Sequence, residues 1–130
     1  MEENQRDKKG VQPRTYYDAA RTFAKVACSA LEEETEGALS VVIQNAYKAI
    51  EFALTGLALS RGRKLLDHGQ TIQFARNLKI ATVDRVVEAL TLYSRSYTIN
   101  ISQLDAKRIV AHMKHVLEEL GRLADYDFSV

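Results

Sequence analysis

The sequence predicts an all-α fold, an antiparallel four-helix bundle with one additional short helix. Apolar residues recur every three to four positions through most of the 130-residue chain, which is the spacing of one face of a helix. The segments between these stretches are short, and short connections place neighbouring helices antiparallel. No stretch is a strand candidate of comparable quality, and the sequence has no internal repeat.

Composition limits the class of protein. A length of 130 residues suits one domain, and a domain of this size buries about two-thirds of the surface of its unfolded chain. The 18 basic and 17 acidic residues give a net charge of +1, which is far from the basic excess of a dedicated nucleic-acid-binding domain. Any contact with RNA would therefore be local.

The single cysteine and the hydropathy pattern indicate the compartment. Cys28 has no cysteine partner in the chain, so it supports neither a disulfide framework nor a cysteine-based zinc site. No apolar run approaches the roughly 20 residues that span a bilayer, and the first residues, MEENQRDKKG, lack the apolar region of a signal peptide. We expect a cytoplasmic protein with no membrane association.

The first helix is expected over residues 15–35, after a flexible lead-in. Residues 1–14 lack apolar periodicity and hold the only proline of the chain, so the bundle domain is expected over residues 15–130. Gly37 can adopt the left-handed conformation that closes the helix. The predicted apolar face is made by Tyr16, Ala20, Phe23, Ala27 and Leu31.

The second helix, expected over residues 38–60, is predicted to be central. Its sequence, ALSVVIQNAYKAIEFALTGLALS, is apolar nearly all round, as in a helix that is surrounded by neighbours. Ile50 lies on its most apolar side. The polar residues form one narrow strip of Ser40, Gln44, Lys48, Glu51 and Thr55.

Three further helices follow. A short one is expected over residues 71–78, TIQFARNL, and the next over residues 81–96, because its apolar residues keep the helical period. Ser102 can cap a last helix that runs to about residue 124, with Asp105 adding negative charge near its amino end. The inward residues of the helix over 81–96 are Val83, Val86, Val87, Leu90 and Tyr93. Those of the last helix are Ala106, Ile109, Val110, Met113, Val116, Leu117, Leu120 and Leu123.

Arginine and histidine pairs raise the question of RNA cleavage. That chemistry needs a group that titrates near neutral pH and a permanent cation, and the two residue types supply them. Arg61 and Arg63 both lie at a suitable spacing from His68, and Arg108 lies at one from His115. Such pairs also arise by accident, so we interpret the first two as a basic turn and the third as a solvated helix face.

Two histidines and a glutamate share a stripe of the last helix. His112, His115 and Glu119 follow Arg108 at helical spacing, and this residue set can bind a transition metal if a further ligand is added. The stripe lies opposite the apolar one, and Arg108 and Lys114 add positive charge beside it. We therefore interpret it as a solvated face and expect no metal and no cofactor.

Arg95 lies between two aromatic residues, Tyr93 and Tyr97. An arginine beside exposed aromatic rings can bind a phosphate and stack a base. The alternative is that both tyrosines pack between helices while Arg95 pairs with a carboxylate such as Glu51.

Three stretches carry a resemblance to a known family. They are NAYKAIEFALTGLALSRG, DHGQTIQFARNL and LYSRSYTINI. In this order they resemble the second helix, the loop histidine with its short helix, and the end of the penultimate helix of the HEPN domains, which are small helical bundles of prokaryotes and eukaryotes. Together they span most of residues 38–124.

The resemblance implies one of two functions. Many members are ribonucleases or toxins with an arginine and a histidine four to six residues apart near the start of the last helix, brought together across a dimer. Other members lack that pair and are binding proteins, often encoded beside a minimal nucleotidyltransferase. Arg63 and His68 lie in the loop after the second helix, and Arg108 and His115 lie well inside the last helix, so neither pair matches the family's site.

The binding class is therefore favoured, and we assign no catalytic residue. The positions that match the family's polar residues are Glu51, His68, Arg95 and Tyr97, which we expect to converge at one end of the bundle as a binding site. We expect a small binding or adaptor protein that binds a nucleotide or RNA, or that pairs with a minimal nucleotidyltransferase in a toxin–antitoxin type module. The alternatives are a metal-independent ribonuclease toxin and a purely structural oligomerisation bundle.

A homodimer is also expected. The apolar content is 46%, and the second helix is apolar on more sides than a lone four-helix bundle easily covers. A twofold pairing lets one patch serve both copies. The first two helices hold the small residues that allow close approach: Ala19, Ala20, Ala38 and Ala46.

Overall fold

The computed structural model describes residues 10–130, and its regular elements within that range are all helices. They are α2 (Pro13–Glu33), α3 (Glu36–Ser60), α4 (His68–Leu78), α5 (Val83–Arg95) and α6 (Gln103–Ala124). The prediction of an all-α fold is confirmed. Residues 1–9 of the predicted lead-in lie outside the described residues. Over residues 10–130, none of the helices combines the length and the apolar character that a membrane crossing requires.

The start of α2 and its end both differ from the prediction. The helix begins at Pro13 rather than near Thr15, because proline suits the first helical position, where its missing N–H costs no hydrogen bond. It ends at Glu33, and the next residue, Glu34, adopts the left-handed conformation with φ 55°. Gly37 does not close it, because Thr35 caps α3 by accepting a hydrogen bond from the Ala38 N–H and so places Gly37 in the first turn of α3.

The buried face of α2 is rotated from the predicted one. Ala20 and Ala27 are buried as expected, whereas Tyr16, Phe23 and Leu31 are only partly buried. The fully buried face is completed by Tyr17, Ala24 and Ala30. The small side chains bring α2 close to α3, where a Cβ on Gly56 would lie 2.7 Å from a ring carbon of Tyr17. Gly56 therefore provides the space that the Tyr17 ring occupies.

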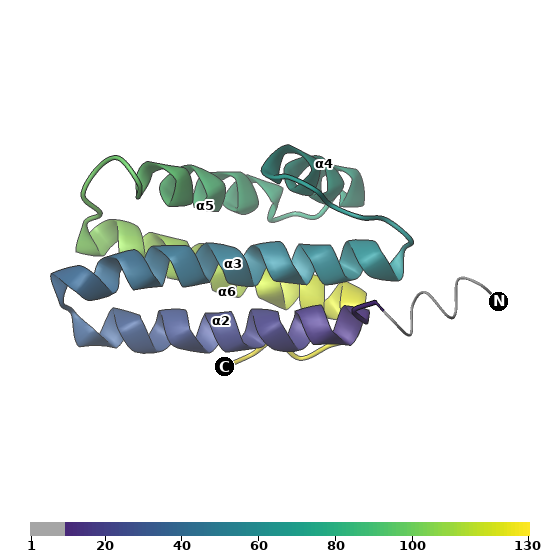
Figure 1. The fold of residues 1–130 in the computed structure, drawn as a ribbon, viewed down its shortest axis with the longest axis horizontal. Helices are drawn as coiled ribbons and strands as arrows, with labels where there is room; N and C mark the ends of the chain where they lie inside the picture. The colour runs from purple at the N-terminus through teal and green to yellow at the C-terminus, as the bar shows by residue number, and fades with distance from the viewer. Residues whose placement is uncertain (1–9) are drawn as a thin grey trace.

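Helix α3 is the central element, as predicted. It contacts α2, α4, α5 and α6, and Figure 1 shows α2 on one side of it, α4 and α5 on the other, and α6 behind. Tyr47, Ile50 and Leu54 are fully buried in it. Glu51, on the predicted polar strip, is partly exposed toward α4.

Helices α4 and α6 begin at capping side chains. Asp67 accepts a hydrogen bond from the Gln70 N–H, so α4 begins at His68, three residues earlier than expected. Ser102 accepts one from the Asp105 N–H and starts α6 as predicted. The predicted stripe of α6 is buried except for Leu123, which is 45% exposed.

A segment after α6 makes contacts that sequence patterning does not reveal. Residues 125–130, which we call the C-terminal strap, turn back at Asp125 in the left-handed conformation and run beside α2. Phe128 is buried against Tyr17, and Tyr126 hydrogen-bonds Asp18. The strap thereby ties the end of α6 to the beginning of α2.

Candidate functional site

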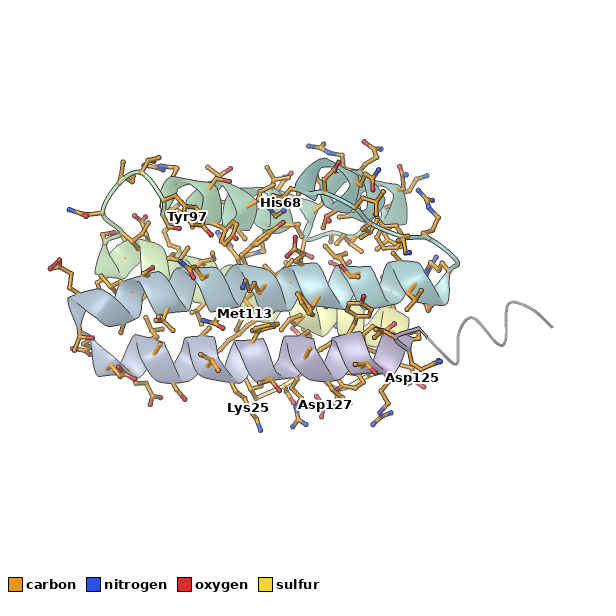
Figure 2. All side chains as sticks on the ribbon, viewed as in Figure 1. Lys25, His68, Tyr97, Met113, Asp125 and Asp127 are labelled. Atoms are coloured by element: carbon orange, nitrogen blue, oxygen red, sulfur yellow. The ribbon has the colours of Figure 1, made fainter. Side chains whose placement is uncertain are left out.

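The four residues predicted to form a binding site lie on three elements. Glu51 projects from α3, His68 is the first residue of α4, and Arg95 ends α5, with Tyr97 in the turn that follows. Figure 2 shows His68 and Tyr97 on the side of the molecule formed by α4 and α5, away from Asp125 and Asp127 beside α2.

Glu51 and His68 make direct contact. The His68 Nδ1 atom lies 3.1 Å from Glu51 Oε2 and 3.2 Å from the hydroxyl of Tyr47. Both partners contact the same ring nitrogen, so Nδ1 either donates to Glu51 or accepts from the Tyr47 hydroxyl, depending on the tautomer. The imidazole is 47% exposed and the Glu51 side chain 26% exposed. Among residues 10–130, Nε2 is thus the ring nitrogen that remains available to a ligand.

A row of aromatic rings connects His68 to Tyr97. The Tyr47 ring meets His68 edge-on at 5.5 Å and stacks on Tyr93 at 4.7 Å. Tyr93 meets Tyr97 edge-on at 5.4 Å, and the Tyr97 hydroxyl donates to the Tyr93 hydroxyl at 3.0 Å. We call Tyr47, Tyr93 and Tyr97 the tyrosine row. It passes from a fully buried ring to one that is 64% exposed, so its outer end offers an aromatic surface to solvent.

Tyr47 and Tyr93 are uncharged at neutral pH. Burial, together with the nearby Glu51 carboxylate, raises the pKa of Tyr47 well above its ordinary value. The hydrogen bond with Tyr97, followed by burial, raises the pKa of Tyr93 to about 12. Both phenols therefore stay protonated and keep their hydrogen bonds.

Arg95 is not brought to Glu51. The ion pair of Glu51 within the described residues is with His68, and Arg95 is exposed at the end of α5. The interpretation in which both tyrosines pack between helices is correct for Tyr93, which is partly buried, and wrong for Tyr97. Arg95 thus remains an exposed cation two residues from the exposed ring.

A cavity of about 400 Å³ lies beside the Glu51–His68 pair. Helix α3, the loop after it and the first turn of α4 all contribute to its lining. The lining residues are Glu51, Phe52, Thr55, Leu65, Leu66, Asp67, His68 and Thr71. The loop residues Arg61, Arg63 and Lys64, just before Leu65, are all exposed.

A larger groove of about 840 Å³ separates α6 from the C-terminal strap. None of the four predicted site residues lines it. Its charged lining mixes Lys114 and Arg122 with Glu118, Asp125 and Asp127, so it favours no one ligand charge. The smaller cavity is the better candidate, because an oriented imidazole lies in its wall.

The predicted solvated face of α6 is wrong for His112. The His112 side chain is 12% exposed and lies between α6 and α5. Arg85 Nη1 lies 3.1 Å from His112 Nδ1, and a guanidinium can only donate, so Nδ1 accepts. Nε2 lies 2.6 Å from Glu88 Oε1, at an angle that falls short of a hydrogen bond. Glu88 also pairs with Arg108.

Glu119 is likewise committed to packing. Its carboxylate accepts hydrogen bonds from the Ala81 N–H at 2.8 Å, the Thr82 N–H at 2.9 Å and the Thr82 hydroxyl at 2.7 Å. Burial alone would raise the pKa of the Glu119 carboxyl, but these hydrogen bonds outweigh burial and lower it. Glu119 thus satisfies the backbone at the start of α5 and is not available to a metal ion.

Comparison with protein-family models, with curated proteins and with solved structures finds no match to this chain. Function must therefore be argued from the geometry of the Glu51–His68 pair and its surroundings.

Proposed function

We propose that this chain is a HEPN-like binding protein, an antiparallel bundle of α2, α3, α5 and α6 with α4 as the additional short helix. The order and the lengths of the helices support the proposal. So does the position of the three stretches that resemble the family, because residues from all of them meet at the tyrosine row and the Glu51–His68 pair.

The proposed ligand is a nucleotide or the end of an RNA strand. The observation that carries this proposal is the Glu51–His68 contact of 3.1 Å beside a cavity and an exposed Tyr97 ring. An aromatic ring that stacks on a base contributes about 1–3 kcal/mol. The cations of the loop over residues 61–64 are exposed just before the cavity residue Leu65, where they would contact phosphate. Arg95 is exposed at the end of α5, two residues from the Tyr97 ring.

The binding test compares three variants. Isothermal titration of the native chain with a nucleoside monophosphate and with a short oligoribonucleotide should give saturable binding. His68→Ala should weaken both, and Tyr97→Ala should weaken that of the oligoribonucleotide, each by about fivefold or more, since each removes one contact worth about 1–3 kcal/mol. His115→Ala, on the exposed face of α6, is the matched control and should bind as the native chain does. Unchanged binding in both site variants, or no binding by the native chain, would contradict the proposal.

The partner proposals extend this function. We propose a cytoplasmic protein that forms a homodimer and pairs with a minimal nucleotidyltransferase. Three of the alanines expected at the dimer interface cannot contact a second copy, because Ala20, Ala38 and Ala46 are buried within one chain. Val26 and Val41, which are 39% and 40% exposed on α2 and α3, are the better contributors. Light scattering at micromolar concentration should give twice 14.6 kDa, and a monomer there would contradict the homodimer.

A ribonuclease is the second candidate, favoured by one observation. Glu51 holds His68 by Nδ1, which is how a carboxylate orients a histidine for proton transfer through Nε2. We nevertheless expect the pure protein to leave labelled RNA intact, because Arg108 is paired with Glu88 and Asp105 and the Arg63–His68 pair lies in a loop. Cleavage by the native chain that disappears in His68→Ala and persists in His115→Ala would favour the ribonuclease instead.

A further inference from the structure

Apart from the His68 imidazole, the polar side chains of the 400 Å³ cavity offer a ligand hydrogen-bond acceptors. Glu51 and Asp67 are carboxylates, and in each the structure engages one oxygen: Glu51 Oε2 with His68, and Asp67 Oδ1 with the Gln70 N–H at 2.8 Å. An ionised carboxylate accepts at both oxygens and never donates. The second oxygen of each side chain is therefore an acceptor that a ligand can use.

The two threonine hydroxyls of the cavity both donate their protons to backbone carbonyls. Thr55 Oγ1 donates to the Glu51 carbonyl at 2.8 Å, and Thr71 Oγ1 donates to the Asp67 carbonyl at 3.1 Å. A hydroxyl has one proton and two lone pairs, so both oxygens can only accept from a ligand. Thr71 is 2% exposed, which holds its side chain in this geometry.

The rest of the lining is apolar and flanked by cations. Phe52, Leu65 and Leu66 form walls that suit a flat ring, and Leu66 is 74% exposed at the rim. The lining residues include no lysine and no arginine, so a phosphate would be repelled from the cavity itself. The exposed cations of residues 61–64 lie immediately before Leu65 in the loop, outside the lining.

We infer that the cavity takes a nucleobase that carries an exocyclic amino group, with Glu51 accepting from that amino group and the phosphate held outside by the cationic loop. This inference rests on the proposed nucleotide-binding function and names its ligand class. An amino group supplies the donors that the acceptor-rich wall lacks. A keto oxygen in the same place would meet the Glu51 carboxylate with two sets of lone pairs and no proton between them.

Cytidine and uridine monophosphates test the inference on the native protein. They share sugar and phosphate, and their bases differ where the amino group and unprotonated N3 of CMP are replaced by a keto oxygen and an N3–H in UMP. Titration calorimetry should give a Kd for CMP that is about fivefold or more below that for UMP, because the partly buried Glu51 carboxylate would be left without a donor. No variant is needed for this comparison.

Two variants identify the residue that discriminates. Glu51→Gln is nearly isosteric and adds an amide N–H that can serve a keto oxygen, so the CMP preference should fall to about twofold or less. Glu118→Gln, on α6 beside the larger groove, removes the same charge far from the cavity and should keep the native preference. A CMP preference that persists unchanged in Glu51→Gln would overturn the inference.

The outcomes separate the inference from the proposed function. Equal binding of CMP and UMP, weakened in both cases by His68→Ala, would overturn the amino-group preference and leave nucleotide binding in place. Absence of binding for both nucleotides, and for AMP and GMP, would overturn the proposed function and this inference together.

Discussion

Two pairs of the same residue types, Glu51–His68 and Glu88–His112, have different surroundings. The His68 imidazole is 47% exposed at the wall of a cavity, whereas the His112 imidazole is 12% exposed between α5 and α6. Arg85 and Glu88 address the two nitrogens of His112, and only Nδ1 of His68 is engaged within the described residues. We call Glu88–His112 the closed pair, because its polar groups lie between two helices. We call Glu51–His68 the open pair, because its imidazole keeps Nε2 available to a ligand.

The difference follows from where each histidine falls in its helix. His68 is the first residue of α4, directly after the Asp67 cap, so few neighbours surround it. His112 lies in the middle of α6, next to the buried Met113, and its side chain reaches the facing helix α5. A histidine inside a helix–helix contact contributes to stability, and one at a helix start is free to contribute to binding.

The largest loss of stability is expected at a core position outside both pairs, and it serves as a reference for the smaller effects. Ile50→Ala removes a fully buried side chain from α3 and should lower the free energy of unfolding by about 2–5 kcal/mol, through lost burial and the cavity left behind. Urea denaturation followed by circular dichroism measures it. A loss below about 1 kcal/mol would contradict the burial of Ile50 in the core around α3.

The closed pair should come next. His112→Ala removes the hydrogen-bond acceptor of Arg85 and a nearly buried ring between α5 and α6, and should cost about 1–3 kcal/mol. His68→Ala, at an exposed site, should change the free energy of unfolding by no more than about 0.5–1 kcal/mol while it weakens nucleotide binding. Equal losses in the two variants would remove the distinction between the open and the closed pair.

A smaller effect, with a defined pH dependence, is expected at Glu119. Glu119→Gln weakens the hydrogen bonds to the start of α5 and should cost about 0.5–1.5 kcal/mol at pH 7. The folded protein lowers the pKa of this carboxyl below its ordinary value of 4.5, so the carboxylate stabilises the fold above that value and the contribution is lost as the pH falls through the lowered pKa.

Denaturant titrations of the native chain and Glu119→Gln at several pH values test the sign. The difference in stability should be full at neutral pH and should shrink on acidification below the ordinary pKa. A difference that grows as the pH falls would mean that the protonated form of Glu119 is the one that the fold favours.

The helices follow from the sequence because apolar periodicity records which faces are buried. The end of a helix can be predicted where the sequence shows the capping residue, as at Ser102. The prediction is displaced where an unexpected residue forms the cap, as at Thr35. Glu51 and His68 are expected in one site because both match polar positions of the HEPN resemblance, but their direct contact is not predicted. Tyr47 was missed although it lies one turn before Glu51, because a tyrosine in an apolar helix is indistinguishable from core.

Other features depend on tertiary contacts that no local pattern contains. The polar stripe of α6 appears solvated in sequence, yet Glu88 and Arg85 approach it from α5. The C-terminal strap has no periodicity, and Phe128 is buried only because α2 and α6 leave a place for it. Arg95 shows the reverse case, a predicted site residue whose pairing with Glu51 is taken by His68.

The central claim, that the open pair binds a ligand and the closed pair does not, is tested most directly by NMR of the histidine side chains during a titration with CMP. The imidazole signals of His68 should shift and saturate together with the calorimetric binding curve, while those of His112 stay in place because its side chain is only 12% exposed between α5 and α6. Assignment follows from His68→Ala, His112→Ala and His115→Ala, each of which removes one set of signals. Signals of His68 that do not move at saturating CMP, or signals of His112 that move as far as those of His68, would contradict the account.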